Sequence, residues 1–530
     1  MKINNLYNFK NPVKNFLDID GLKFADDIGT WGIEKLCWTK PFNFRVKKQG
    51  DKYRTIKMPN IINFKKAYLH FNDMPRFYNI HGLDLKHKRL VADLLTGDFK
   101  SGEYEKHLEK DFEKLCIYDN LMRVDIKEYY GRIYTHYIEF HDHKENFLSN
   151  MNLGATNGLI MGNYISLYFA EANLKSISND IEKEINDSGL DCEFTYFSDD
   201  FYFFCNNKDN EKIIKIFDNV LEKYELERND EKKELWTYET FNSYNLITRY
   251  WKKLIAHCNT KYKEEDNNNN MYFINQLVYR ISKLENNKLK KVFIDNFFKT
   301  KYFQERNLDK YQIHNYDYHQ LCFIFKFSPE AMLYAINKFS TMCDFDKHKL
   351  HKFFKIRYKE ILQEPFNDEQ LYFYYAIKVL NYEDIIVEEK AAVLKSNNQL
   401  LISYYLQDGI FESEDINKLK EFNEEKYWFQ NYHLILYSED LLSNIDESIN
   451  RYLIPIYAKK EAQIKTYFNF YKENLEARKP IIREISGVYR EIKDYLTAKF
   501  TESKNTNEDS IEVAEEFELL DNDSDEMFNE

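Results

Sequence analysis

The sequence predicts an α+β fold in the first half of the chain and an all-α fold in the second half. From about residue 43 to 240, short runs of alternating apolar residues, typical of strands, are mixed with stretches of helical spacing. After about residue 245 the apolar residues repeat with a period of about 3.6, and convincing strand patterns are absent. We therefore expect a mixed unit at residues 1–245 and a helical unit at residues 246–500.

A local sequence pattern predicts each strand and helix of the mixed unit. Residues 44–59, "FRVKKQGDKYRTIKMP", alternate around Gly50 as a hairpin does, and "LMRVDIKEYY" is a buried strand that runs into a polar turn. Helical spacing follows at 165–185 and again at 210–226, on either side of two short strands at 194–205. In the second half, helices of roughly 10 to 20 residues joined by short turns indicate a HEAT-like array.

Composition and charge indicate a soluble protein. No stretch approaches the roughly 18 apolar residues of a membrane span, and the polar start "MKINNLYNFK" is not a signal peptide, so we expect a cytoplasmic protein without a membrane partner. Seven scattered cysteines without a CxxC pair favour a reducing compartment and no zinc site. Residues 501–530 carry −11 of the net charge of −13, which predicts a disordered acidic tail and a nearly neutral body.

The sharpest chemical signal is a pair of acids inside an aromatic run. Asp199 and Asp200 lie in the middle of "FTYFSDDFYFFC", where two apolar strands meet, so we expect a hairpin with the acids at its tip. Asp125 ends another apolar strand. If the strands are neighbours in one sheet, Asp125 and Asp199 meet at its edge and need a cation to stay ionised. An isolated pair of aspartates is more often a turn or a cap.

Oxygen ligands of this kind suit Mg²⁺, with Mn²⁺ as the second choice. Two such ions about 4 Å apart can activate a hydroxyl and stabilise a leaving pyrophosphate. Between the acids, small residues recur at every fourth position, at Gly158, Gly162, Ser166 and Ala170. On a helix they make a narrow ridge that lets a sheet or a base pair approach, and plain packing of a helix on a sheet is an equal alternative.

The order of these motifs resembles the palm of a reverse transcriptase over about residues 40 to 235. Asp125 with Ile126 resembles the first catalytic motif, and "FSDD" resembles the YxDD box, with Phe197 in place of tyrosine. The resemblance implies that Asp125, Asp199 and Asp200 are catalytic. It also implies that Asp125, Asp199 and the residue Ile126 bind two Mg²⁺ ions, with Asp200 as a further ligand.

Further positions complete the resemblance, and they imply a nucleotide site. Tyr130 resembles the aromatic residue that stacks under the deoxyribose and excludes a 2′-hydroxyl, and Gly162 belongs to the second motif. "LERNDEKK" gives Asn229 and Lys232, where Lys232 is a general acid for pyrophosphate or a solvated cap lysine. The residues Lys47, Lys48 and Arg54 resemble the basic fingers hairpin that grips a triphosphate, and among them Lys47 and Arg54 are our candidates.

The continuation "YYGRIYTH" resembles the abortive-infection (Abi) phage-defence reverse transcriptases, as does the order of fingers, palm and helical domain. That resemblance implies DNA synthesis from dNTPs without a template, primed by a protein tyrosine, so that single-stranded DNA stays attached to the protein. It also implies homo-oligomers, trimers rather than hexamers. We nominate Tyr7 as the primer because it lies on a polar N-terminal arm, and an anchoring role is the alternative.

Two alternatives stay open. The second motif usually reads LPQG, whereas this chain has "LIMG" at residues 159–162, and the missing Pro and Gln favour template-free extension over copying. A templated enzyme with a bound non-coding RNA is the other enzyme hypothesis. A binding scaffold without activity is the third hypothesis. Separately, a histidine at the position of His136 is structural more often than it is a proton shuttle.

Overall fold

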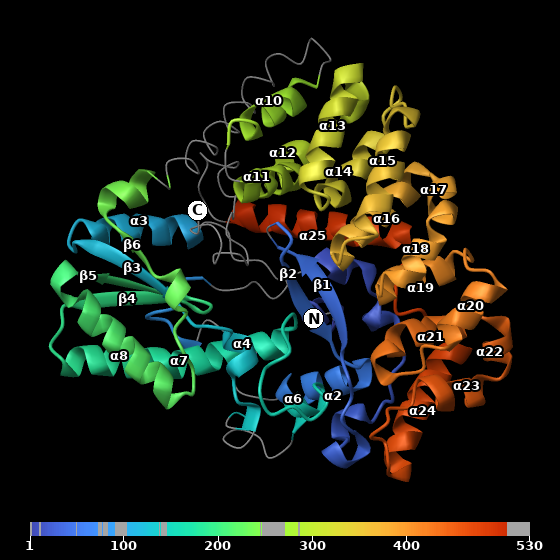
Figure 1. Ribbon diagram of the computed structural model, residues 1–530, viewed down its shortest axis with the longest axis horizontal. Helices are drawn as coiled ribbons and strands as arrows, with labels where there is room; N and C mark the ends of the chain where they lie inside the picture. The colour runs from blue at the N-terminus through green and yellow to red at the C-terminus, as the bar shows by residue number, and fades with distance from the viewer. Residues whose placement is uncertain are drawn as a thin grey trace.

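The computed structural model describes residues 3–9, 12–48, 50–72, 83–90, 103–136, 146–243, 271–284 and 287–505, with the single residues 77, 138 and 245. In this part the chain is mostly helical and has two small antiparallel sheets. Figure 1 shows the larger sheet at one side of the molecule, a two-stranded hairpin at its centre, and the helices of the second half around the other side. No described helix is both long and apolar enough to cross a membrane.

The larger sheet carries the acidic motifs. Its strands are β3 (Asn120–Asp125), β4 (Cys192–Phe197), β5 (Asp200–Cys205) and β6 (Glu234–Trp236), in the spatial order β4-β5-β3-β6. All three pairings are antiparallel. Aromatic residues dominate β4 and β5, because their side chains pack well on a pleated surface.

Helices cover both faces of this sheet. The helices α7 (Tyr164–Asp187) and α8 (Asn210–Lys223) lie on one face, and α3 (Glu103–Leu115) lies on the other, as Figure 1 shows. Phe201 contacts Phe217 of α8 with 5.1 Å between ring centroids, whereas Phe204 belongs to a separate buried cluster with α3. Because successive residues of a strand point to opposite faces, a strand covered twice is apolar throughout.

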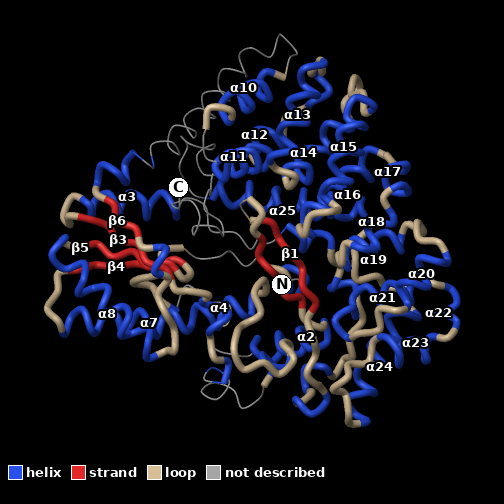
Figure 2. The backbone as a smooth tube through the Cα atoms, in the orientation of Figure 1, coloured by secondary structure: helices blue, strands red, loops and turns tan. Residues whose placement is uncertain are grey.

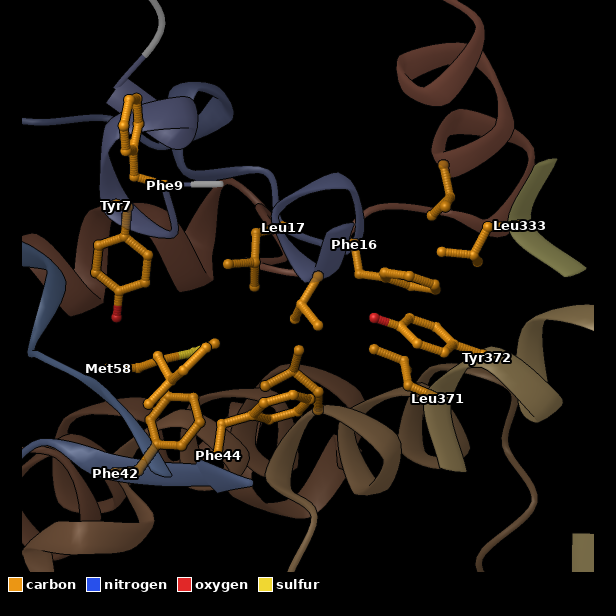
Figure 3. Close-up of a cluster of buried hydrophobic side chains, with 14 of the residues drawn as sticks. Tyr7, Phe9, Phe16, Leu17, Phe42, Phe44, Met58, Leu333, Leu371 and Tyr372 are labelled. Carbon is orange, nitrogen blue, oxygen red and sulfur yellow. The ribbon is translucent and has the colours of Figure 1, made fainter. Parts of the chain in front are cut away.

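The basic hairpin is separate from this sheet. Strands β1 (Phe42–Lys47) and β2 (Tyr53–Met58) pair only with each other among the described strands, and Val46 faces Arg54 in the register. A two-stranded hairpin is marginal alone. Here it packs against the helical half, because Phe42 contacts Phe429 with 5.1 Å between ring centroids. Figure 3 shows Phe42, Phe44 and Met58 beside side chains of that half.

After residue 271 every described helix or strand is a helix, and Figure 2 shows this half almost entirely in the helix colour. A HEAT-like order of these helices stays a prediction. Their bounds are α10 (Tyr272–Ile281), α11 (Asn287–Lys299), α12 (Lys301–Gln304), α13 (Asn315–Phe327), α14 (Ala331–Ser340), α15 (His348–Ile361), α16 (Asn367–Leu380), α17 (Glu383–Glu388), α18 (Lys390–Lys395), α19 (Gln399–Gln407), α20 (Ser413–Lys420), α21 (Trp428–Tyr437), α22 (Glu439–Ser443), α23 (Ile445–Tyr452), α24 (Glu461–Glu476) and α25 (Ile485–Asn505).

The N-terminal segment is built into this helical half. Asp18 N donates to Ile481 O at 2.7 Å, and Arg483 N donates to Phe16 O at 2.9 Å. The ring of Phe16 packs edge-on against Tyr375 and Tyr404. The remaining helices of the first half are α1 (Ile3–Tyr7), α2 (Ile61–Asn72), α4 (Tyr129–Arg132) and α6 (Phe147–Asn150).

Two sequence expectations meet the limits of the described residues. The expected boundary at 245/246 falls next to residues 246–270, which lie outside them, and so do residues 506–530 of the expected tail. Residues 501–505 belong to α25, so the helix continues five residues beyond the expected end of the helical unit.

The expected ridge of small residues on a helix is wrong for its two glycines. Helix α7 begins only at Tyr164, and Gly158 and Gly162 precede it with φ of +92° and +111°. These angles are outside the helical region and favour glycine. A Cβ on Gly162 would lie 2.5 Å from the Cγ2 atom of Ile56, so the close approach is to the basic hairpin. The period of four arose from residues in two different conformations.

Candidate active site at the edge of the four-stranded sheet

Asp125 and Asp199 meet at one edge of the larger sheet. Strand β3 ends at Asp125, and the turn between β4 and β5 consists of Ser198 and Asp199 because Phe197 pairs with Asp200. Ile126 N donates to Asp199 O at 3.1 Å, which fixes the tip of the turn beside the end of β3. Ser198 has φ of +52°, a conformation that costs a non-glycine residue free energy and that recurs at functional turns.

Asp200 follows Asp199 in the chain, but its carboxylate is engaged elsewhere. It is fully buried, and Arg123 holds it with Nε to Oδ1 at 3.1 Å and Nη2 to Oδ2 at 2.8 Å. Glu234 approaches the same guanidinium at 3.6 Å. Burial works against the charge of Arg123, but Asp200 and Glu234 raise its pKa above the usual value. Arg123 therefore compensates the desolvation that we expected a metal to offset.

The sequence did not single out Arg123, although its position carries a signal. It lies two residues before Asp125 on the same strand, so both side chains share one face of the sheet. Register places Arg123 opposite Tyr202, diagonal to Asp200. An arginine inside an apolar strand needs a carboxylate partner, and the nearest diagonal acid is the natural one.

A cleft of about 1230 Å³ lies at this edge of the sheet. Its lining comes from the basic hairpin, from the end of β3 with the turn and helix α4 that follow, from the β4–β5 turn, and from the segment at 218–232. The residues that line it are Lys48, Arg54, Asp125, Ile126, Lys127, Glu128, Tyr129, Tyr130, Gly131, Met161, Asp199, Asp218, Glu222, Leu226, Glu227, Arg228, Asn229, Asp230, Glu231 and Lys232. Asp200 is not among these residues.

The basic hairpin brings Lys48 and Arg54 to the cleft, but not Lys47. Lys47 Nζ lies 3.0 Å from Glu369 Oε2 of α16 and 4.5 Å from the ring centroid of Phe366. The expectation that Lys47 faces the nucleotide is therefore wrong. Neighbouring side chains of a strand point in opposite directions, so a shift of one residue selects Lys48 in place of Lys47.

Tyr130 lines the cleft between the acids and the basic hairpin. Burial raises the pKa of its hydroxyl well above the usual value, and the carboxylates of Glu171 and Asp199 raise it further, whereas Arg54 lowers it. These opposing effects mean that Asp199 and Arg54 both lie near the phenol. Tyr130 O accepts from Leu159 N at 2.8 Å, so the residue is anchored to the segment that precedes α7. Gly162 does not line the cleft, but its neighbour Met161 does.

The segment after α8 is laid along the end of β3. Asn229 N donates to Asp125 O at 2.8 Å, and Lys127 N donates to Glu227 O at 2.9 Å. These two bonds lie on either side of the antiparallel bridge between Ile126 and Arg228. The Ile126 carbonyl therefore does not accept a hydrogen bond from the segment that contains Arg228. Lys232 Nζ lies 3.5 Å from Asp125 Oδ2. The structure thus brings two of the candidate residues, Lys232 and Asp125, together.

Tyr7 does not have the accessible position that we expected of a primer. Its side chain is 2% exposed, and its hydroxyl donates to Pro59 O at 2.5 Å. Burial raises the pKa of that hydroxyl well above the usual value. Figure 3 shows Tyr7 inside a cluster of buried side chains. Tyr7 therefore lacks an accessible hydroxyl in this state of the protein, because contacts with Pro59 and Phe64 enclose its side chain. His136 is also outside the lining of the cleft.

The donor set at the cleft fits a hard divalent cation in part. Among the described residues, no group of three or more histidine, cysteine or acidic side chains could hold a metal. The cleft is instead lined by Asp125, Asp199 and Ile126, which can offer two carboxylates and a backbone carbonyl. Mg²⁺ commonly uses one or two carboxylates and takes its other ligands from water and phosphate. Two carboxylates and a carbonyl are compatible with that habit.

Comparisons with known proteins give little family information. No family model matches the chain, and no curated protein matches it. Among solved structures the chain is weakly similar to a telomerase from Candida albicans in complex with a fragment of telomeric RNA, at 10% identity and a TM-score of 0.28. The alignment covers 72% of this chain and 65% of the telomerase chain, so it spans less than two thirds of that protein.

Proposed function

We propose that this protein is a nucleotidyltransferase of the reverse-transcriptase type. The observation that carries the proposal is the meeting of Asp125 and Asp199 at the mouth of one cleft, although 74 residues separate them in the chain. A phosphoryl-transfer site needs acids, cations and a platform for the nucleotide close together. Arg54, Tyr130 and Lys232 line the same cleft.

Each residue has a role that its position supports. Asp125, Asp199 and the carbonyl of Ile126 would hold Mg²⁺, which supplies activation of the attacking hydroxyl and stabilisation of the charge on the phosphates. Lys48 and Arg54 bind the triphosphate, because a guanidinium fork and an ammonium suit phosphate oxygens.

The other cleft residues act on the sugar and the leaving group. Tyr130 lies under the sugar and selects deoxynucleotides by leaving no room for a 2′-hydroxyl. Lys232 stands beside Asp125 and donates a proton to the departing pyrophosphate. Asp200 does not bind metal in this scheme; it holds Arg123 and with it the strand that carries Asp125.

The finer part of the proposal is template-free DNA synthesis primed by a protein tyrosine, in an oligomeric phage-defence protein. Two features support synthesis without a template. The "LIMG" segment lacks the proline and glutamine of the usual motif. In the described part of the chain helices also cover both faces of the palm-like sheet, which leaves its edge for the approach of a substrate to the acids. The priming tyrosine is not Tyr7 in the described state.

The test supplies purified protein with Mg²⁺ and labelled dNTPs, without primer or template. We expect label that migrates with the protein on a denaturing gel and disappears after proteolysis. Asp199→Asn should abolish labelling. Asp230→Asn is the matched control, because Asp230 lines the same cleft, is 83% exposed and pairs with Arg228. Label that depends on added RNA would support the templated enzyme, and an inactive parent would leave only the scaffold.

A further inference from the structure

The start of helix α16 contacts the β1–β2 hairpin that carries Lys48 and Arg54. The side chains involved are Asn367, Asp368 and Glu369, which are 4%, 5% and 6% exposed. They are more than 300 residues away from the hairpin in the sequence, and nothing in the local patterns pairs the two segments. The contact is therefore a tertiary feature that only the fold reveals.

The side chains of α16 accept hydrogen bonds from the free edge of β1, as a third strand would. Lys48 N donates to Lys52 O at 2.9 Å, so the N–H groups of even-numbered β1 residues face β2 and those of Arg45 and Lys47 face outward. Arg45 N donates to Asn367 Oδ1 at 2.9 Å, and Lys47 N donates to Asp368 Oδ1 at 3.1 Å. Two side-chain oxygens on one turn of helix thus satisfy the edge that a neighbouring strand would otherwise cover.

An ion pair reinforces these bonds. Lys47 Nζ lies 3.0 Å from Glu369 Oε2, and the Lys47 ammonium stacks over Phe366. Glu369 is buried, so this pair is screened by water less than a surface pair. Burial and the neighbouring Glu369 raise the pKa of Asp368 to about 7.

A buried network of amide side chains holds the start of α16 in one conformation. Asn398 Nδ2 donates to Asn367 O and to Gln370 Oε1, both at 2.9 Å. Gln370 Nε2 in turn donates to Glu364 O at 2.9 Å. Gln370 and Asn398 are 0% and 1% exposed. A network in which every member is bonded fixes side chains in one orientation, so the acceptors that face the hairpin cannot easily turn away.

We propose that Asn367, Asp368 and Glu369 are positioning residues for nucleotide binding: they lock the basic hairpin against the helical half and so place Lys48 and Arg54 in the cleft. The role in nucleotide binding rests on the proposed function. The contact of these three side chains with β1, which we call the lock, does not. The side chains of the lock face one side of β1, while Lys48 and Arg54 line the cleft. The triphosphate site is then preformed, and the helical half sets its geometry without touching the nucleotide.

The test compares three variants of the full chain. Asp368→Leu removes the acceptor for Lys47 N, and Asp368→Asn keeps an oxygen in the same place. Asp415→Leu is the matched control, because Asp415 is also a buried acid that accepts a backbone N–H, from Glu412 at 3.2 Å, but in α20. Hydrogen exchange of a peptide covering residues 42–58 reports the lock. The KM for dNTP, the kcat and the binding of a fluorescent dNTP report its consequence.

For Asp368→Leu we expect faster exchange in residues 42–58 and a KM for dNTP raised about tenfold at similar kcat, the effect of losing one hydrogen bond to a charged group. Asp368→Asn should match the parent in both measurements, and Asp415→Leu should change neither. If Asp368→Leu does not fold, Glu369→Gln loosens only Lys47 and is measured in the same way.

Three results would overturn the proposal or part of it, and a fourth would refute the proposed function alone. Unchanged exchange in Asp368→Leu would refute the lock. Faster exchange with unchanged KM and unchanged nucleotide binding would refute the positioning role. A parent that binds the fluorescent dNTP but makes no DNA would refute the proposed function alone, because exchange and binding still judge the lock. A parent that neither binds nor incorporates the nucleotide would refute the positioning role together with the proposed function.

Discussion

Replacing Asp200 by asparagine should destabilise the protein, whereas the same change at Asp199 should remove activity and leave stability nearly unchanged. Asp200 is fully buried and makes two hydrogen bonds to Arg123, whose side chain is 3% exposed. Breaking a buried ion pair from one side costs about 3–5 kcal/mol because a charge is left without its partner. Asparagine keeps one acceptor and Glu234 stays nearby, so we expect the lower end, about 3 kcal/mol.

Thermal unfolding followed by fluorescence measures this difference. At about 2–4 °C per kcal/mol for a unit of 150–250 residues, Asp200→Asn should lower the transition of the first half by roughly 6–12 °C. Asp199 is on a half-buried turn, so Asp199→Asn should shift it by less than about 2 °C. The double variant Arg123→Met with Asp200→Asn should recover part of the loss, since no charge is stranded. An Asp200→Asn protein that melts like the parent but is inactive would refute this reasoning and return Asp200 to the metal site.

Three further predictions follow from buried contacts. Tyr7→Phe should keep all DNA labelling and lose about 1 kcal/mol of stability, measured by urea unfolding, because only the bond to Pro59 is lost. Gly162→Ala should cost about 2 kcal/mol or more, from its positive φ and the Ile56 contact, whereas Gly189→Ala, with φ of +61° and open space, should cost less. Asp368 binds its proton more tightly in the folded than in the unfolded state, so the parent loses stability as pH rises from about 4 to 7; the unfolding free energy of Asp368→Asn relative to the parent should therefore rise over that range, and a flat difference would contradict the raised pKa.

Local patterns predicted the elements on which the site is built. The alternation on both sides of Ser198 gave the β4–β5 hairpin with its acids at the turn, and the apolar run before Asp125 gave β3. Both faces of β3 and β5 are buried, so the apolar pattern alone does not fix the register between them. The meeting of Asp125 with Asp199 was predictable on the condition that their strands are neighbours in one sheet, whereas Lys232 was a candidate through the resemblance to reverse transcriptases.

The errors concern contacts that no local pattern records. The sequence could not tell Lys47 from Lys48, because the choice depends on which face of β1 meets α16. Tyr7 looked accessible because polar residues surround it in the chain, although Pro59 and Phe64 bury it. The period of small residues at Gly158 and Gly162 matched a helix, but periodicity carries no information about φ.

The embedding of the first residues among the last helices makes the order of synthesis matter. The backbone of Phe16, Leu17 and Asp18 pairs with residues 481–483, near the end of the chain. Until that segment has been synthesised, these backbone groups lack the partners that they have in the structure, although the bonds of Tyr7 to Pro59 and of Phe9 to Gly162 join residues of the first half. We therefore expect a polypeptide that stops before residue 481 to contain every acid of the cleft but to hold its first residues less firmly than the full chain does.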